Sequence, residues 1–203
     1  KYKYIFFDLD GTLLNTLEDL KDSTNYALAQ HSYPTRTLEE VRCFVGNGIR
    51  KLIDRAVPEG TSVEKTDKVF ATFREYYATH SRVKTSMYEG MEQVMDALKE
   101  QNISMAIVSN KADDAVKDLA KYYFAKYIDV AIGEREGISR KPAPDSVYEA
   151  MRLLGATKEN TVYVGDSDVD RATAKNAGIP CISVTWGFRS EELLVSLEPE
   201  YLI

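Results

Sequence analysis

Two carboxylates stand two residues apart, directly after a short apolar run near the start of the chain. Asp8 and Asp10 follow Tyr4-Ile5-Phe6-Phe7, and Gly11 comes next. An apolar run of this length predicts a buried strand whose carboxyl end carries both acids, where ligands bind in open α/β sheets. Such a pair suits a bound cation or a reacting phosphorus, because the two side chains point the same way if the strand continues. An acidic turn that only closes the strand is the alternative.

Polar and charged side chains also follow two later strand-like runs. The run at 103–108 leads into Ser109-Asn110-Lys111, and the run at 161–164 leads into a segment that begins Gly165-Asp166 and ends at Asp170. Between them, Lys141 lies in a loop that Pro142 and Pro144 stiffen, which suits a charge held in place. Three strands therefore deliver reactive groups at the same end.

These motifs resemble those of the haloacid dehalogenase-like (HAD) superfamily, which has Asp-x-Asp, Ser/Thr, Lys and Gly-Asp-x-x-x-Asp in this order. All four occur here, across nearly the full chain. The resemblance implies an α/β fold, a doubly wound parallel-sheet (Rossmann-like) core with an inserted α-helical cap. It also implies a central first strand, flanked by the strands that end in Ser109 and in Gly165-Asp166. The crevice beside Asp8 would then be the topological switch point of the sheet.

The resemblance also implies catalytic roles. Asp8 would be the nucleophile that forms an aspartyl phosphate, and Asp10 the general acid that later acts as base. Lys141 would balance the charge of Asp8 and of the phosphoryl group. Ser109, with the backbone N–H of Asn110, would bind the substrate phosphate, although Ser109 could instead cap the helix that follows. Thr12, the common choice of hydrolases in this family, is also counted among the substrate-binding residues.

A magnesium ion is the implied cofactor. Mg²⁺ prefers oxygen ligands and keeps several waters, so few protein ligands suffice. By the resemblance these are the carboxylate of Asp8, the backbone carbonyl of Asp10 and the carboxylate of Asp166. Asp170 would hold metal-bound water or Lys141 from the next layer. Asp168 lies outside the motif and is expected to face solvent or to cap a helix.

The chain between 16 and 82 shows helical periodicity only, broken at Pro34 and again at 58–62. From 88 onward, strands and helices alternate, as in βαβ units. We therefore expect residues 1–14 and 84–203 to form the catalytic core and residues 15–83 to form a helical cap (lid) that closes the site. The expected strands lie near 3–8, 103–108, 128–132, 161–165 and 180–185, and Gly155 and Gly178 are expected to end helices.

One stretch of the insert resembles the corresponding part of phosphoglycolate phosphatases, where the cap faces the substrate. It contains Gly46, Asn47 and Arg50, and Arg50 or Lys51 could meet a substrate carboxylate. An exposed basic helix is the alternative. The segment around Trp186 resembles the same branch, although Trp186 could equally be a core or interface aromatic.

Composition sets outer limits. The 203 residues are 44% hydrophobic and 29% charged with a net charge of −6, as in a soluble globular protein, which argues against nucleic acid or anionic lipid as a main partner. No apolar stretch reaches the ~18–20 residues of a membrane span, and the first strand begins too early to leave room for a signal peptide. We therefore expect a cytoplasmic protein, a monomer or weak homodimer. The remaining expectations concern Cys43 and Cys181 as buried small hydrophobes, and His31 and His80 as surface or packing residues.

The sequence thus predicts a Mg²⁺-dependent phosphatase that hydrolyses a small, phosphoglycolate-like phosphomonoester through an aspartyl phosphate. Two alternatives stay open. A sugar phosphomutase of the β-phosphoglucomutase type shares all four motifs, although those mutases usually carry Val where Thr12 stands. A non-catalytic phosphate-binding regulatory protein on the same fold would not need both Asp10 and Asp166.

Overall fold

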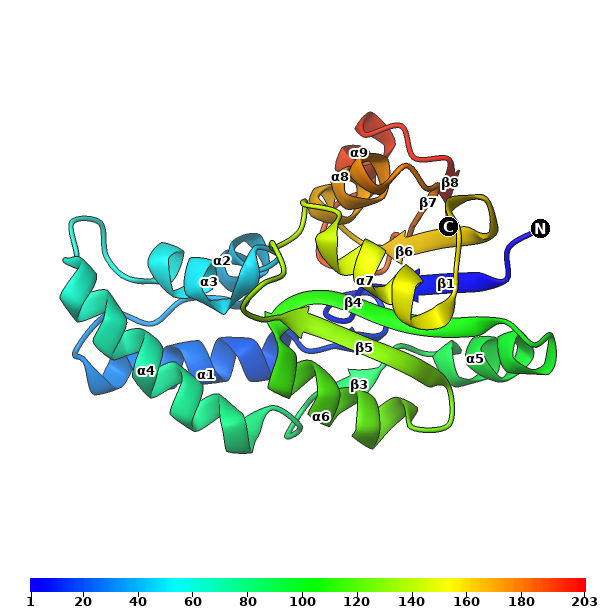
Figure 1. Cartoon of the computed structure of the whole chain (residues 1–203). Coiled ribbons are helices and arrows are strands. Elements are labelled where there is room, and N and C mark those ends of the chain that lie inside the picture. The colour runs from blue at the N-terminus through cyan, green and yellow to red at the C-terminus, as the bar shows by residue number, and fades with distance from the viewer. The chain divides into compact units, whose positions relative to one another are not determined.

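The computed structural model describes all residues from 1 to 203 and divides the chain into two compact units (Figure 1). The larger unit combines Lys1–Leu14 with Met87–Ile203, and the smaller comprises Asn15–Ser86. The short strands β2 (Leu14–Asn15) and β3 (Ser86–Met87) pair where the chain passes from one unit to the other. That the smaller unit acts as a lid stays a prediction.

The larger unit is built on a 6-stranded parallel sheet with the order β5-β4-β1-β6-β7-β8. The first strand lies between β4 and β6, as predicted, and the doubly wound α/β class is confirmed. The carboxyl ends of β1, β4 and β6 are therefore neighbours at one edge of the sheet. The strands are β1 (Tyr4–Phe7), β4 (Ser104–Ala112), β5 (Ile128–Glu134), β6 (Thr161–Gly165), β7 (Cys181–Ser183) and β8 (Tyr201–Leu202).

Helices cover both faces of this sheet (Figure 1). Successive side chains of a strand point to opposite faces, so Ile5 and Phe7 pack with α5 and α6, whereas Phe6 packs with α7 and α8. A continuous apolar run is therefore what a doubly covered strand requires. The helices are α5 (Met91–Glu100), α6 (Asp113–Phe124), α7 (Asp145–Leu154) and α8 (Asp168–Ala177), with the short 3-10 turn η1 (Lys158–Asn160) before β6 and α9 (Glu191–Ser196) near the chain end.

The strand boundaries differ from the prediction at three places. β4 runs on to Ala112, past a register shift against β5 that begins after Val108, so that Ser109 and Asn110 belong to the strand rather than follow it. β7 is shorter than expected, and β8 was missed because two residues carry no periodicity. Gly155 and Gly178 do end α7 and α8, with φ of 68° and 74°, as predicted.

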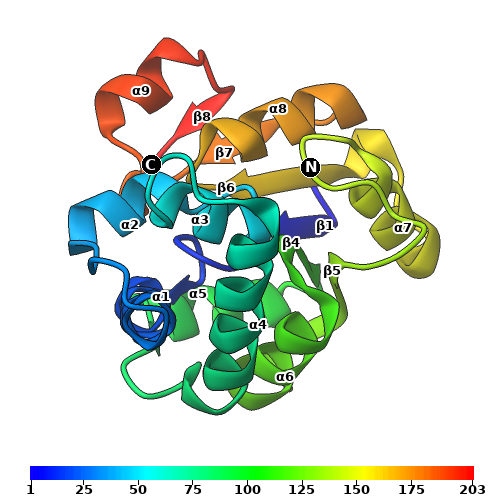
Figure 2. The same ribbon diagram turned by 90° about the vertical axis from the view of Figure 1, so that its left-hand side faces the viewer.

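The smaller unit is helical, and its helices begin at recognisable caps. The Thr37 hydroxyl accepts from the backbone N–H of Glu40, and the Ser62 hydroxyl accepts from that of Lys65. In Figure 2 the two long helices α1 and α4 lie side by side. The helices are α1 (Leu17–Gln30), α2 (Leu38–Phe44), α3 (Gly48–Ala56) and α4 (Val63–His80).

Cysteine and histidine placements test two smaller expectations. Cys181 is buried, as predicted, but the expectation for Cys43 was wrong because this side chain is exposed. Val41 is the buried position of α2, and a residue two positions later on a helix points to nearly the opposite side. His31 lies 2.9 Å from the Thr72 hydroxyl and His80 stacks on Tyr76, so both histidines pack within the helical unit.

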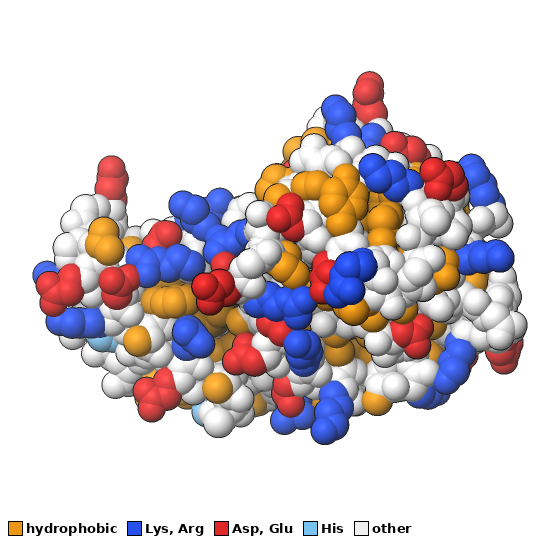
Figure 3. Space-filling view, in the orientation of Figure 1, with side chains coloured by type: hydrophobic (Ala, Val, Ile, Leu, Met, Phe, Trp, Pro, Cys, Tyr) orange, Lys and Arg blue, Asp and Glu red, His pale blue; other side chains and the backbone are white.

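Two further features concern the hydropathy of the helices and the charge of the surface. None of the helices combines the length and the hydropathy needed to cross a membrane. Basic and acidic side chains are interspersed over the face drawn in Figure 3.

Gly133 on β5 lies where no side chain fits. A Cβ at this position would lie 2.5 Å from the Cα of Asp113 and 2.5 Å from the carbonyl oxygen of Lys111, both of which are backbone atoms. We expect Gly133→Ala to lower the free energy of unfolding by about 3 kcal/mol, measured by urea denaturation, because the backbone cannot yield without moving β4. Gly137→Ala is the control: it meets no atom within 4 Å and adds only the strain of φ +82°, about 1 kcal/mol. Equal losses in the two variants would contradict the steric explanation.

Candidate active site

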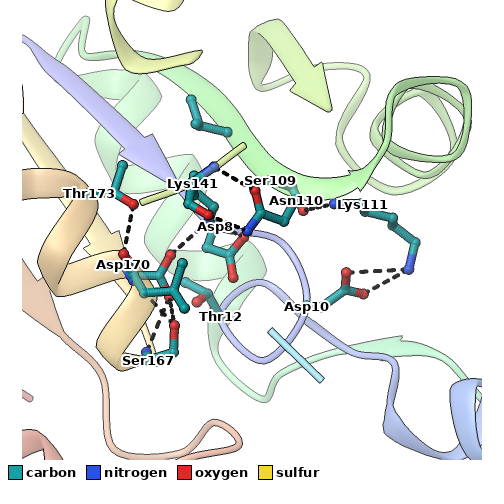
Figure 4. A network of polar contacts seen from close by, with 12 residues as sticks. Asp8, Asp10, Thr12, Ser109, Asn110, Lys111, Lys141, Ser167, Asp170 and Thr173 are labelled. Carbon is teal, nitrogen blue, oxygen red and sulfur yellow. Dashed lines mark hydrogen bonds and ion pairs between the residues drawn. The ribbon is translucent and has the colours of Figure 1, made fainter. Parts of the chain in front are cut away.

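A buried lysine lies at the centre of the polar groups gathered at this sheet edge (Figure 4). The Nζ of Lys141 lies 3.0 Å from Asp8 Oδ1, 2.8 Å from Asp170 Oδ1 and 2.9 Å from the hydroxyl of Tyr163. The lysine side chain is 3% exposed and that of Asp170 1%. The end of β1 and the β6–α8 segment, which are far apart in the sequence, therefore meet on one ammonium group from a third segment.

The side chain of Asn110 holds the Lys141 loop in place. Its Oδ1 accepts from the backbone N–H of Lys141 at 2.8 Å, and its Nδ2 donates to the carbonyl of Lys141 at 3.1 Å. The prediction gave Asn110 a role through its backbone only. The paired amide contact adds a second role, which is to fix the register between the end of β4 and the loop that carries the lysine.

Tyr163 is a site residue that sequence reasoning missed. Its hydroxyl accepts from Lys141 and lies 3.0 Å from the carbonyl oxygen of Val108 and 3.1 Å from Asp170 Oδ1. Tyrosine in a strand-like run is easily counted as an apolar residue. The available signal was that a buried Tyr hydroxyl needs a partner, and that Tyr163 lies just before the Gly165-Asp166 motif.

Asp170 uses its two carboxylate oxygens for different tasks. One accepts from Lys141, as the prediction for this residue allowed, and the other accepts from the hydroxyl of Ser167 at 2.6 Å. Ser167 is the N-cap of α8 and accepts in turn from the backbone N–H of Asp170. The start of the helix thus fixes the carboxylate that holds the lysine. Gly165 is required beside it, because a Cβ there would lie 2.3 Å from the Cβ of Asp170.

Asp166 is held by uncharged donors. Thr12 donates to its Oδ1 at 3.2 Å, and the backbone N–H of Phe188 donates to its Oδ2 at 2.8 Å. The Thr12 hydroxyl, predicted to bind substrate, is therefore directed at Asp166. Trp186 donates from its indole to the carbonyl of Thr12, so the segment that resembled the phosphoglycolate phosphatase branch braces this carboxylate. Gly187 is needed there, since a Cβ would lie 2.2 Å from that of Asp166.

The structure shows the surroundings of Asp168 and whether Ser109 caps the helix that follows it. Asp168 is about half exposed and pairs with Arg189, which agrees with a solvent-facing position outside the motif. Ser109 does not cap α6, because that helix begins at Asp113 with Ala112 as its N-cap residue. Its hydroxyl accepts from the backbone N–H of Lys111 instead.

Asp10 has a partner that the motifs do not include. Lys111 places its Nζ 3.0 Å and 3.3 Å from the two oxygens of the Asp10 carboxylate. The side chain of this lysine is 3% exposed, and that of Asp10 is 20% exposed. In Figure 4 this pair lies to one side of the Asp8–Lys141–Asp170 group.

The predicted cap residues lie in the smaller unit and already have partners there. Arg50 pairs with Asp54 at 2.9 Å and with Asp67. The Oδ1 of Asn47 accepts from Arg55. Gly46 has a φ of 119°, which suits glycine at the turn before α3. That these residues contact substrate stays a prediction.

Comparison with known proteins identifies the family. A sequence model of haloacid dehalogenase-like hydrolases matches residues 5–184. The chain belongs to this family. It is 31% identical over 207 residues to phosphoglycolate phosphatase 1 of Pseudomonas aeruginosa, covering 99% of this chain and 76% of that protein. It is 30% identical over 202 residues to pyrophosphatase PpaX of Halalkalibacterium halodurans, covering 98% of this chain and 91% of that protein.

Solved structures agree with this assignment. A candidate phosphoglycolate phosphatase of Lactobacillus delbrueckii subsp. bulgaricus superposes with a TM-score of 0.94 at 34% identity, covering 100% of this chain and 94% of that one. A predicted phosphoglycolate phosphatase of Haemophilus somnus gives a TM-score of 0.92 at 27% identity, covering 99% and 93%. The protein is thus an enzyme of the haloacid dehalogenase-like hydrolase type, related to phosphatases.

In this haloacid dehalogenase-like hydrolase, negative charge is concentrated at the site. Carboxylate oxygens of Asp8, Asp166 and Asp170 all lie within 4.8 Å of one another. Burial, followed by the charge of Asp170, raises the pKa of Asp8 well above its usual value and that of Asp166 to about 7. Burial alone would lower the pKa of Lys141, but Asp170 and Asp8 outweigh it and raise that pKa well above normal. Lys141 therefore carries a positive charge.

The raised pKa of Asp166 predicts that the metal-free protein loses stability as pH rises. The pKa is 3.8 for an ordinary Asp and about 7 in the fold, so the folded state binds more protons than the unfolded state between these values. The free energy of unfolding should fall across this range and stay low above it. With EDTA present, we expect Tm to be lower at pH 8 than at pH 5 by roughly 5 °C, given about 2–4 °C per kcal/mol.

Asp166→Asn is the matched control, because the amide cannot titrate. The drop in Tm between pH 5 and pH 8 should be clearly smaller in this variant than in the wild type. An equal drop in both proteins would show that the pH dependence arises elsewhere.

Proposed function

We propose that this protein is a Mg²⁺-dependent phosphatase that hydrolyses small phosphomonoesters, with 2-phosphoglycolate as the model substrate, through an aspartyl phosphate on Asp8. The observation that carries the proposal is the buried ammonium of Lys141, shared by Asp8 and Asp170. A fixed cation beside a carboxylate nucleophile offsets the repulsion between that carboxylate and an anionic phosphoryl group. The relatives named as phosphoglycolate phosphatases support the choice of substrate.

The first step would transfer the phosphoryl group to the protein. Lys141 would favour the ionised form of Asp8 against burial and the neighbouring acids, and a bound Mg²⁺ would add to that effect. An Asp8 carboxylate oxygen attacks phosphorus, and the bond from phosphorus to the ester oxygen breaks. The leaving oxygen keeps the electron pair and takes a proton from the protonated carboxyl of Asp10, the neighbouring acid of the motif. Lys141 and the Ser109 hydroxyl, with the backbone N–H of Asn110, would stabilise the phosphoryl oxygens.

The second step would release phosphate. Asp10, now a carboxylate, takes a proton from a water molecule whose oxygen attacks phosphorus. The acyl-phosphate bond then breaks, which returns the Asp8 carboxylate and inorganic phosphate. In the observed arrangement Asp10 is paired with Lys111, so that pair must separate before Asp10 reaches the leaving oxygen.

The site fits a magnesium ion. The carboxylate oxygens of Asp8 and Asp166 lie within 4.8 Å of each other, and with the backbone carbonyl of Asp10, which the resemblance implies, they would form an all-oxygen donor set of the kind that Mg²⁺ prefers. The direct partners of Asp166 are Thr12 and the backbone of Phe188, which carry no charge, and burial, followed by the negative potential of Asp170, raises its pKa to about 7. When bound, Mg²⁺ would offset this potential and the charge that develops on the phosphoryl oxygens. Asp170, engaged with Lys141 and Ser167, would remain outside the ligand set.

Pyrophosphate is the second candidate substrate, because two relatives carry the name pyrophosphatase PpaX. A sugar phosphomutase remains an outcome of the test, recognised by a sugar phosphate as product instead of free phosphate. Action on a small phosphorylated metabolite, a cytoplasmic location and a monomeric or weakly dimeric state are parts of the proposal still to be measured.

The experiment measures phosphate release from 2-phosphoglycolate, pyrophosphate and p-nitrophenyl phosphate, with Mg²⁺ or with EDTA. We expect Mg²⁺-dependent release that falls by at least about a thousandfold in Asp8→Asn, because the amide is not a nucleophile. Asp129→Asn, an exposed aspartate on β5, is the control and should retain wild-type rates. Turnover that survives in Asp8→Asn would exclude the aspartyl-phosphate route, and release unaffected by EDTA would exclude the metal.

A further inference from the structure

The buried pair of Lys111 and Asp10 needs an explanation beyond the motifs. Lys111 lies at the irregular end of β4, and its Nζ contacts both oxygens of Asp10. Its side chain is 3% exposed, and burying an ammonium group is costly unless it is paired. A lysine on an exposed helix surface could pair with a carboxylate at a lower cost in desolvation free energy. This position therefore indicates a use for the charge inside the site.

Lys111 adjoins the residues expected to hold the phosphate. Its backbone N–H donates to the hydroxyl of Ser109 at 3.2 Å, and Asn110 between them grips the backbone of Lys141. A compact substrate whose phosphate is held by Ser109 and Lys141 would therefore have its other end near this segment. In the observed arrangement, the partly exposed carboxylate of Asp10 pairs with the ammonium group of Lys111.

We propose that Lys111 determines specificity by binding a second anionic group of the substrate, a carboxylate or a second phosphoryl group close to the ester. This inference rests on the proposed phosphatase function and names its substrate class. The incoming anion replaces the Asp10 carboxylate on Lys111. The freed Asp10 carboxylate takes up a proton from solvent and can then reach the leaving oxygen as the acid. A phosphomonoester with a neutral end leaves the Lys111–Asp10 pair intact and is turned over more slowly.

Replacing Asp10 by the substrate anion keeps a negative charge beside Lys111. Before binding, the ammonium group pairs with the Asp10 carboxylate, and after binding it pairs with the substrate anion, so the exchange replaces one anionic partner of Lys111 with another. The overall charge of −6 would repel small anions, so a local cation is needed to select them. Lys141 cannot serve both ends of the substrate, because Asp8 and Asp170 already hold it beside the phosphoryl site.

The test compares two esters that differ only at the far end, 2-phosphoglycolate and 2-hydroxyethyl phosphate. We expect the wild-type enzyme to prefer the carboxylate in kcat/KM by at least about tenfold, the value of one charge-assisted contact. In Lys111→Met this preference should fall to about twofold or less, mainly because 2-phosphoglycolate becomes a poorer substrate. Lys117→Met, an exposed lysine paired with Asp113 on α6, is the matched control and should keep the wild-type preference.

Lys111→Arg separates charge from packing. It retains a cation and should keep a clear preference for 2-phosphoglycolate, and it supplies the test if Lys111→Met does not fold by circular dichroism. An undiminished preference in Lys111→Met would overturn the inference. So would a loss of preference in Lys111→Arg while its activity on 2-hydroxyethyl phosphate persists, or a wild-type enzyme that does not discriminate between the two esters.

Failure of the proposed function gives a different result. If the wild-type enzyme releases phosphate from neither ester and from neither p-nitrophenyl phosphate nor pyrophosphate, the phosphatase proposal fails. Calorimetric titration of 2-phosphoglycolate then decides the inference separately. Binding that weakens at least about tenfold in Lys111→Met would support an anion-binding role, and unchanged or undetectable binding would overturn it.

Discussion

The ammonium group of Lys141 is the interaction on which the rest of the site depends. It is almost fully buried, and a buried charge is tolerated only with close partners. Those partners come from Asp8 after β1, Tyr163 on β6 and Asp170 on α8. Because the three cannot move independently of this lysine, the end of the central strand, its neighbour and the following helix are held at one point. The parallel order β4-β1-β6 is what makes that meeting possible.

Each acid of the site has a different environment, which is how similar carboxylates obtain different roles. Asp8 is buried beside a cation and three other acids, and its pKa is raised. Asp166 is held by uncharged donors, which leaves negative potential suited to a metal ion. Asp10 is partly exposed and paired with Lys111, the contact that we propose a substrate exchanges. In the proposed mechanism the same side chain would thus serve as nucleophile, metal ligand or mobile acid and base according to what surrounds it.

Close backbone approach is the second constraint. Gly187 lies against Asp166, and Gly165 lies against Asp170, where any Cβ would overlap the carboxylate side chain. Gly133 plays the same part for the segment that carries Lys111. These glycines are needed because backbone at the sheet edge lies directly against the acid side chains at Gly187 and Gly165, and against the backbone of Lys111 and Asp113 at Gly133.

The sequence by itself determined the alternation of strands and helices and the polar groups that follow Phe7 and Val164, because apolar runs and their polar ends are local patterns. The central place of the first strand, and the choice of Asp8, Lys141, Asp166 and Asp170, came from the resemblance to the haloacid dehalogenase-like superfamily, since periodicity carries no strand order. Only the tertiary structure decided that the Tyr163 hydroxyl contacts Lys141, that Lys111 pairs with Asp10 and that Thr12 donates to Asp166. It also corrected the prediction that Cys43 is buried and the predicted end of β4. Such contacts join residues far apart in the chain, and side-chain direction at an irregular strand end has no period that a sequence can display.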